Sequence, residues 1–185
     1  MKNLLVMALA VLITATCSGQ NFFTKNGKIN FDATSPSSPE RVEAVNRSAT
    51  CVIDTKGGDM QFVALMKGFE FERALMEEHF NENYMESDKF PRAEFKGKIK
   101  DNDDINYSKE GTYSVKVKGK LTMHGQSNDV DTDAKITIQN GKISAVADFS
   151  VKLADYNISI PGLVADKISK TAKISVSCSL EPLKN

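Results

Sequence analysis

The chain has 185 residues, with 24 lysine and arginine residues against 24 aspartate and glutamate residues, so its formal net charge is zero. A length of this order suits a single domain. The balanced charge disfavours a nucleic-acid ligand, which would call for a basic patch.

The first twenty residues predict a secretory signal peptide. Lys2 supplies the positive start, residues 4–13 form an apolar run too short to span a bilayer, and small residues follow. We expect cleavage near Gly19–Gln20, one domain over residues 21–185 and a periplasmic location. Anchoring as a lipoprotein through Cys17 is a less favoured alternative, because Thr16 and Thr14 stand where such signals carry a small and an aliphatic residue.

The next segments predict three strands. Ile29 and Phe31 mark a short first strand, and residues 42–54 read as a long second one. Polar and apolar residues are not cleanly separated between the two faces of that second strand, since Arg47 would share a face with Val45. A bulge would explain this mixed pattern. Gly57 and Gly58 then predict a hairpin turn. The following strand has an inward face formed by Met60, Phe62, Ala64 and Met66.

From residue 71 to residue 84 the apolar spacing changes to three and four, which predicts one amphipathic helix. Its apolar stripe consists of Phe71, Leu75, Met76, His79, Phe80 and Tyr84. Pro91 stops any continuation. We expect this helix to pack on a sheet edge or to cover the mouth of a barrel.

Beyond the helix, a strand resumes at residues 93–99, and residues 111–153 alternate apolar and polar side chains with almost no break. Asn140 and Gly141 predict a tight hairpin with positive φ at both positions. The last strand covers residues 173–180. Together these elements predict an all-β fold, an antiparallel barrel of about eight strands with one helix inserted after the third strand. A closed barrel of this size can hold one small ligand.

Two cysteines remain after the signal peptide. Cys178 lies on the apolar face of the last strand, and Cys51 lies on the second strand between Ala49 and Ile53. In an oxidising compartment the pair could form a structural disulfide, provided that the first and last strands are neighbours. The alternative is that both are small buried hydrophobic residues.

Motifs for catalysis or metal binding are missing. The two histidines, His79 and His124, lack the companions that a zinc site needs. The acidic run from Asp101 departs from a calcium loop at its sixth and twelfth positions. No serine occupies a nucleophile elbow. The sequence therefore predicts no catalytic residue, no metal and no cofactor.

The predicted inner surface is the remaining candidate for a binding site. It is a packed core or the wall of a cavity, and small inward residues such as Ala64 and Ala147 favour the cavity slightly. We expect its lining and mouth to comprise Phe62, Phe71, Phe80, Phe95, Tyr113, Val115, Val117, Leu121, Met123, Ile136, Phe149, Val151, Leu153, Tyr156 and Ile158, with His79 and His124 as polar groups at the rim.

Three segments in register resemble the YceI-like family. They are FEFERALMEEHFNENYM at residues 69–85 continuing as FPRAEFKG at 90–97, GKLTMHG at 119–125, and DYNISIP at 155–161, the last as in the Bacteroidetes-type version. The chain departs from many relatives at residues 126–128 and at Glu77 and Glu78. The resemblance implies a lipocalin-like barrel, exported to the periplasm, with a polyisoprenoid or quinone in its interior. It also implies that His79, Phe80, Phe95 and residues 121–124 lie in or around the barrel.

The leading hypothesis is therefore a periplasmic, non-enzymatic carrier of an apolar isoprenoid-type lipid, held inside the barrel as its ligand. Transient contact with a membrane or a membrane protein is expected, whereas nucleic acid is not. The oligomeric state stays open, a homodimer being one alternative. A second hypothesis is an interaction or stress-response module with a packed interior. A third is an enzyme acting on a lipid, which would need His79 or His124 close to a Ser, Asp or Glu inside a cleft.

Overall fold

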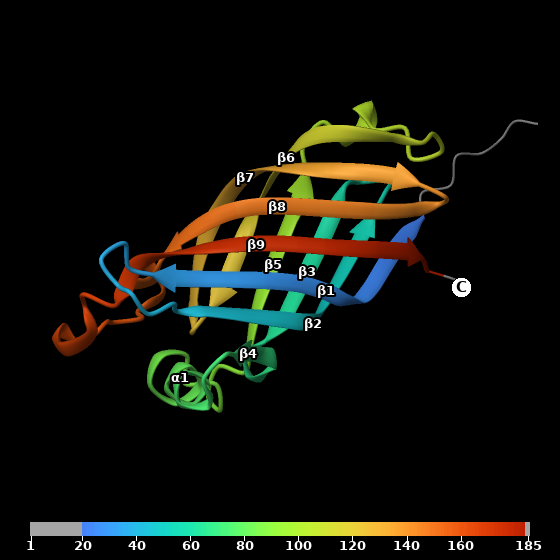
Figure 1. The fold of residues 1–185 in the computed structure, drawn as a ribbon. Coiled ribbons are helices and arrows are strands. Elements are labelled where there is room, and N and C mark those ends of the chain that lie inside the picture. Colours follow the sequence, from blue (N-terminus) through green and yellow to red (C-terminus); the bar gives the residue numbers. More distant parts are fainter. Residues whose placement is uncertain (1–19, 184–185) are drawn as a thin grey trace, which may run out of the picture.

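The computed structural model describes residues 20–183, so the predicted signal peptide and Cys17 lie outside the described residues. Within that range the chain folds into one antiparallel sheet with a short helical segment (Figure 1). The strands are β1 (Asn21–Thr34), β2 (Glu43–Asp54), β3 (Asp59–Leu65), β4 (Phe69–Phe71), β5 (Arg92–Ile99), β6 (Gly111–Met123), β7 (Gln126–Gln139), β8 (Lys142–Lys152) and β9 (Ile168–Pro182).

Eight of these strands close into a barrel. The hydrogen-bonded order is β1-β9-β8-β7-β6-β5-β3-β2, and pairing of β1 with β2 completes the ring. The short β4 adds to β2 at Ala44–Asn46, away from the stretch of β2 that pairs with β3. The predicted eight-stranded antiparallel barrel is confirmed. Closure leaves the ring without the unpaired edges that favour aggregation.

The predicted helix is also confirmed, with different bounds. It consists of α1 (Ala74–His79) followed by a wider π-helical turn, η2 (Phe80–Tyr84). Phe71 belongs to β4 instead, because its backbone pairs with Ala44 of β2. The remaining helical turns are η1 (Met66–Gly68), η3 (Asn102–Asp104), η4 (Leu153–Tyr156) and η5 (Gly162–Val164).

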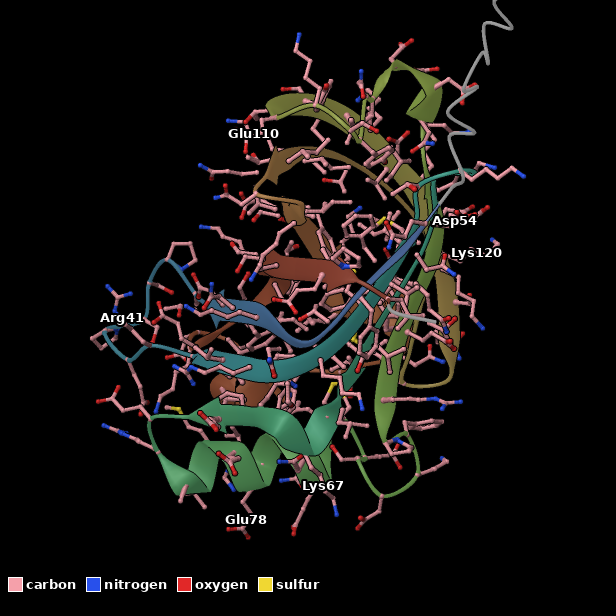
Figure 2. All side chains as sticks on the ribbon, turned by 90° about the vertical axis from the view of Figure 1, so that its right-hand side faces the viewer. Arg41, Asp54, Lys67, Glu78, Glu110 and Lys120 are labelled. Atoms are coloured by element: carbon pink, nitrogen blue, oxygen red, sulfur yellow. The ribbon has the colours of Figure 1, made fainter. Side chains whose placement is uncertain are left out.

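The β6–β7 hairpin is the longest continuous ladder, and it carries rows of opposite charge on its outer face. Three lysines of β6 lie directly opposite three aspartates of β7, forming the pairs Lys116–Asp133, Lys118–Asp131 and Lys120–Asp129. The hydrogen bond from Lys118 lowers the pKa of Asp131. Figure 2 shows the labelled charged side chains, Lys120 among them, on the outside of the barrel. This face therefore remains hydrated while the opposite face of the same strands turns inward.

The predicted bulge in the second strand is present. Gly27 of β1 pairs with Ala49, but Ile29 pairs with Asn46, so β2 carries an extra residue between them. Asn46 therefore points inward on one side of the bulge and Ala49 on the other, whereas Arg47 lies on the outer face. Asn46 is fully buried, but its amide donates to the Leu65 carbonyl at 3.0 Å and its oxygen accepts from Ser48. The bulge thus resolves the mixed pattern without leaving this polar group unsatisfied.

The two ends of the barrel differ in their packing. At the end that holds the β2–β3 turn and the carboxyl terminus, the interior is filled by a cluster of buried residues that includes Ile53, Ile99, Ile136 and Leu180. At the other end lie the β1–β2 loop, α1 and the segment that precedes β9 (Figure 1). We call these the closed end and the open end.

Two hydrogen bonds secure the closed end. The Tyr107 hydroxyl donates to the Asn102 side chain at 2.7 Å, and the Asn102 amide donates to the Thr55 carbonyl at 2.9 Å. Burial, aided by the negative charge of Asp54, raises the pKa of Tyr107 to about 12. A tyrosine in the unfolded chain titrates near pH 10.

Tyr107 is expected to make stability depend on pH in the alkaline range. Because its folded-state pKa is the higher one, its contribution is complete below about pH 10 and is lost as the pH rises to about 12. Urea unfolding at a series of pH values should show a steeper fall in the free energy of unfolding for the native protein than for Tyr107→Phe. Parallel curves for the two proteins between pH 10 and 12 would contradict this assignment.

Candidate functional site

An apolar cavity of about 550 Å³ occupies the barrel interior. Its wall is built from the inward positions of β1, β2, β3, β5, β6, β7, β8 and β9, and it extends to the helix at the open end. Small-molecule sites in proteins fall in the same size range. A barrel interior packed throughout, which was one of the two sequence-based alternatives, is therefore not what the structure shows.

Aromatic rings join the helix to the open end. The Phe80 ring lies 5.8 Å from that of Phe31 on β1, and 5.5 and 5.0 Å from those of Phe69 and Phe71 on β4. These spacings are favourable for aromatic pairs. All four rings line the cavity. Phe80 thus anchors the helical segment against the barrel while contributing to the cavity wall.

The charged side chains that line the cavity gather at its open end. They are Glu40 from the β1–β2 loop, Arg73 directly before α1, and Lys167 directly before β9. Arg73 forms an ion pair with Glu40, and the Lys167 ammonium lies 3.7 Å from the same carboxylate. Glu40 therefore connects three segments around the opening, although solvent weakens pairs as exposed as these.

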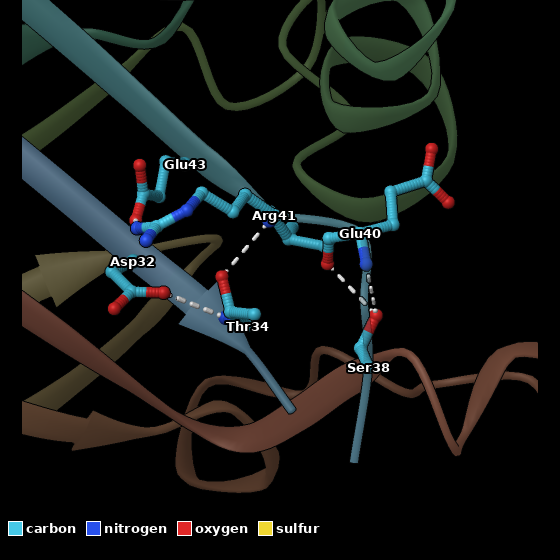
Figure 3. A network of polar contacts seen from close by, with 7 residues as sticks. Asp32, Thr34, Ser38, Glu40, Arg41 and Glu43 are labelled. Carbon is cyan, nitrogen blue, oxygen red and sulfur yellow. Dashed lines mark hydrogen bonds and ion pairs between the residues drawn. The ribbon is translucent and has the colours of Figure 1, made fainter. Parts of the chain in front are cut away.

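The loop that carries Glu40 is held by its own hydrogen bonds (Figure 3). The Glu40 backbone N–H donates to the Ser38 hydroxyl at 3.1 Å, and the Val42 N–H donates to the Thr34 hydroxyl at 2.9 Å. In Figure 3 the Glu40 side chain points towards the helical segment, whereas Arg41 points away from it and pairs with Glu43 at 2.6 Å. The loop thus directs a single acidic side chain to the opening.

Most of the residues predicted to form the site are brought together at this cavity. The structure places in its wall Phe62, Phe71, Phe80, Phe95, Val117, Leu121, Met123, Ile136, Phe149, Val151, Leu153, Ile158 and His79. Those on β3 and on β5 to β8 occupy the inward positions that alternation assigns. The others come from β4, from the helical segments and, for Ile158, from the loop after η4.

Four predicted residues lie elsewhere. Tyr113 and Val115 pack against the filled closed end, because they stand at the far part of β6. Tyr156 is buried in η4, behind the cavity wall, and burial raises the pKa of its hydroxyl. His124 lies in the β6–β7 turn. Three charged residues of the opening were missed. Glu40 and Lys167 lie in connecting segments without periodicity, and Arg73 falls on the polar face of the predicted helix.

The His124 side chain connects three segments of the chain outside the cavity. Its Nδ1 lies 2.8 Å from the Tyr156 carbonyl oxygen, and its Nε2 lies 2.9 Å from the Glu86 carboxylate. A carbonyl oxygen only accepts, so Nδ1 is the donor to Tyr156. Both ring nitrogens are thus engaged by partners outside the cavity.

Removing the His124 imidazole is expected to destabilise the protein. His124→Leu would remove the hydrogen bonds to the Tyr156 carbonyl and to Glu86, whose carboxylate would keep only Lys89 at 3.8 Å, and the His124 side chain is only 10% exposed. We expect a loss of about 2 kcal/mol in the free energy of unfolding, measured with urea. His79→Leu is the matched control and should change it by less than about 0.5 kcal/mol, since His79 is exposed. Equal effects of the two substitutions would refute the assignment.

Within residues 20–183, no group of three or more His, Cys, Asp or Glu side chains lies close enough to hold a metal ion. No helix of the same range is long and apolar enough to cross a membrane. Cys51 and Cys178 are both buried, and their sulfur atoms are not bonded to each other in the structure.

Solved structures with this fold include a polyisoprenoid-binding domain from Saccharophagus degradans, with a TM-score of 0.76 and 16% identity over 90% of this chain and 100% of that one. BcnA from Burkholderia cenocepacia follows, with a TM-score of 0.65 and 14% identity over 83% and 95% of the two chains. The YCEI protein of Campylobacter jejuni aligns with a TM-score of 0.55 and 19% identity over 75% and 81%. These likenesses establish the fold.

A comparison with curated proteins finds no match. A family model does match, and it spans almost the entire chain. It describes a YceI-like domain and covers residues 10–180, which includes all three segments whose resemblance was noted from the sequence. The protein therefore belongs to the YceI-like family.

Proposed function

We propose that this protein binds and carries an apolar, isoprenoid-type lipid, such as a polyprenyl or quinone-like chain, inside the barrel and without catalysis. The observation that carries the proposal is the apolar cavity of about 550 Å³ whose charged residues are confined to its opening. Burying a hydrocarbon chain there would contribute roughly 25 cal/mol per Å² of apolar surface, before the costs of association. The polyisoprenoid-binding domain of the same fold supports this ligand class.

Export to the periplasm through residues 1–20 is part of the proposal. Binding an insoluble chain is useful where lipids must cross an aqueous compartment between membranes. The signal-like amino terminus supports this location, with lipid anchoring through Cys17 as the alternative.

Native mass spectrometry of protein exported by its own signal tests the proposal, followed by extraction and identification of the lipid. A stoichiometric adduct with an isoprenoid mass is the expected result. Titration of stripped protein with farnesol provides a second measurement that does not depend on what the host supplies. Failure to bind farnesol, together with an unloaded exported protein, would reject the carrier function. The same spectrum reports the oligomeric state and the mass of the processed amino terminus.

Membrane contact at the open end is the natural route for loading. Leu163 of η5 is 95% exposed, and Leu75 of α1 is 61% exposed although it also lines the cavity. Both belong to segments of the open end, and Val164, which follows Leu163, lines the cavity. We propose that these leucines dock on a lipid bilayer, where an aliphatic side chain is stabilised by partial insertion.

Leu163→Asp should therefore slow transfer of geranylgeraniol from phosphatidylcholine vesicles to the protein by about fivefold, since a charge opposes insertion. Its equilibrium affinity for farnesol added from ethanol should be unchanged. Leu183→Asp is the matched control, because Leu183 is 44% exposed at the closed end. If both substitutions slow transfer equally, the open end has no special part in docking.

A further inference from the structure

The two cysteines lie on strands that are not neighbours. Cys51 is on β2 and Cys178 is on β9, and β1 runs between them. The ladders on both sides of β1 are irregular at this level. Towards β2, Thr24 pairs with Cys51 and the next pair is Gly27 with Ala49. Towards β9, pairing is interrupted between Phe23 and Lys28.

This irregularity brings β2 and β9 together. Lys25 and Asn26 of β1 both face solvent, so the strand bulges away from the interior at this point. Gly27 follows, and a Cβ atom there would lie 2.9 Å from the Ala49 carbonyl oxygen, which shows how closely the backbones approach. Residues of β2 and β9 come within 8 Å of each other, measured between Cα atoms. A disulfide requires its two Cα atoms to lie within about 7 Å of each other, so this approach of the strands is close to what a cross-link needs.

The two cysteines lie inside the barrel and line the same cavity. The Cys51 side chain is fully buried and Cys178 is 8% exposed. The Cys178 S–H donates to the Ala145 carbonyl at 3.8 Å. Their mutual hydrogen bond raises the pKa of Cys51, as burial also does, and lowers the pKa of Cys178. Cys178 is also the more accessible of the two residues, so we expect its sulfur to react first.

We propose that Cys51 and Cys178 form a disulfide bond that fastens the second strand to the last strand across the bulge of the first. The oxidant is a small disulfide. The Cys178 thiolate attacks one of its sulfurs and releases one thiolate. Cys51 then loses its proton and displaces the second thiolate from Cys178. Two protein thiols are oxidised, and one external disulfide is reduced to two thiols.

The bond would join residues that lie far apart in the sequence, and cross-linking a long loop restricts the unfolded chain strongly. For a domain of this size, the oxidised protein is expected to melt roughly 10 °C higher than the reduced one. Lipid binding in the cavity does not depend on this bond. The carrier function and the disulfide are therefore tested independently of each other.

The test is to refold the full chain in a glutathione redox buffer, quench it with acid and digest it without reduction. Mass spectrometry should find one peptide pair that links Cys51 to Cys178 and disappears after reduction. Melting in the presence and absence of reductant should differ for the native protein but not for the double variant Cys51→Ala, Cys178→Ala. The single variants provide the reference for an unpaired thiol.

Two results would overturn the proposal. One is separate alkylation of Cys51 and Cys178 after denaturation of fully oxidised protein. The other is a melting temperature that responds to reductant to the same extent in the native protein and in the double variant.

Discussion

Replacing Gly119 with valine is expected to cost about 5 kcal/mol of the free energy of unfolding, a loss large enough to prevent folding in many domains. Gly119 of β6 lies directly opposite Gly97 of β5. A Cβ at residue 119 would overlap the Lys96 carbonyl oxygen and lie 2.7 Å from the Phe95 ring. The neighbouring backbone cannot retreat, because it is held in the ladder.

Valine has a higher intrinsic preference for strands than glycine, which by itself would raise the free energy of unfolding. A decrease would therefore identify the steric overlap as the cause. If strand propensity dominated, Gly119→Val would stabilise the protein. Gly162→Val is the matched control, because nothing lies within 4 Å of a Cβ at residue 162, and it should stay within about 0.5 kcal/mol of the native protein. Urea unfolding followed by circular dichroism measures both. A soluble, equally stable Gly119→Val protein would show that the close approach of β5 and β6 can relax.

Filling the cavity from within is expected to abolish lipid binding while the barrel stays folded. Ala147 of β8 pairs with Ala134 of β7 and with Val176 of β9, and all three line the cavity. Ala147→Phe would place a ring in the empty volume. We expect the affinity for farnesol to fall by more than about tenfold, which corresponds to about 1.4 kcal/mol. The free energy of unfolding should change little, because the added ring occupies space instead of displacing a packed side chain.

Ser150→Phe is the control for this substitution, since Ser150 lies on the outer face of the same strand. It adds the same ring without entering the cavity, and it should bind farnesol like the native protein. Fluorescence titration or calorimetry gives the affinities. Native affinity in a folded Ala147→Phe protein would place the ligand somewhere other than in the barrel.

The faces of the strands could be predicted from the sequence, whereas depth along the barrel could not. Alternation assigns Val115 and Val117 to the same inner face of β6, and the structure agrees that both point inward. Only Val117 reaches the cavity, because the interior beside Val115 is filled by residues from the closed end. A period of two carries no information on which level of a barrel is packed and which is hollow.

The charged residues at the opening of the cavity could not be predicted from the sequence for a related reason. Glu40, Arg73 and Lys167 are far apart in the chain and no repeating pattern relates them to one another, so only the closed barrel brings them together. The first strand was predicted too short as well. Its alternation is interrupted where Lys25 and Asn26 bulge outwards, and tertiary pairing with β2 and β9 extends it to Asn21–Thr34.

The position of β1 between β2 and β9 also bears on the order in which the barrel assembles. The β6–β7 hairpin joins residues that are close in sequence, so it can form early. By contrast, Phe22 pairs with Pro182, and this contact must await the final strand. Folds dominated by such distant pairings form slowly. A chain that cannot close until its last strand emerges stays open during synthesis, which is the state that the proposed export through a narrow translocation channel would require.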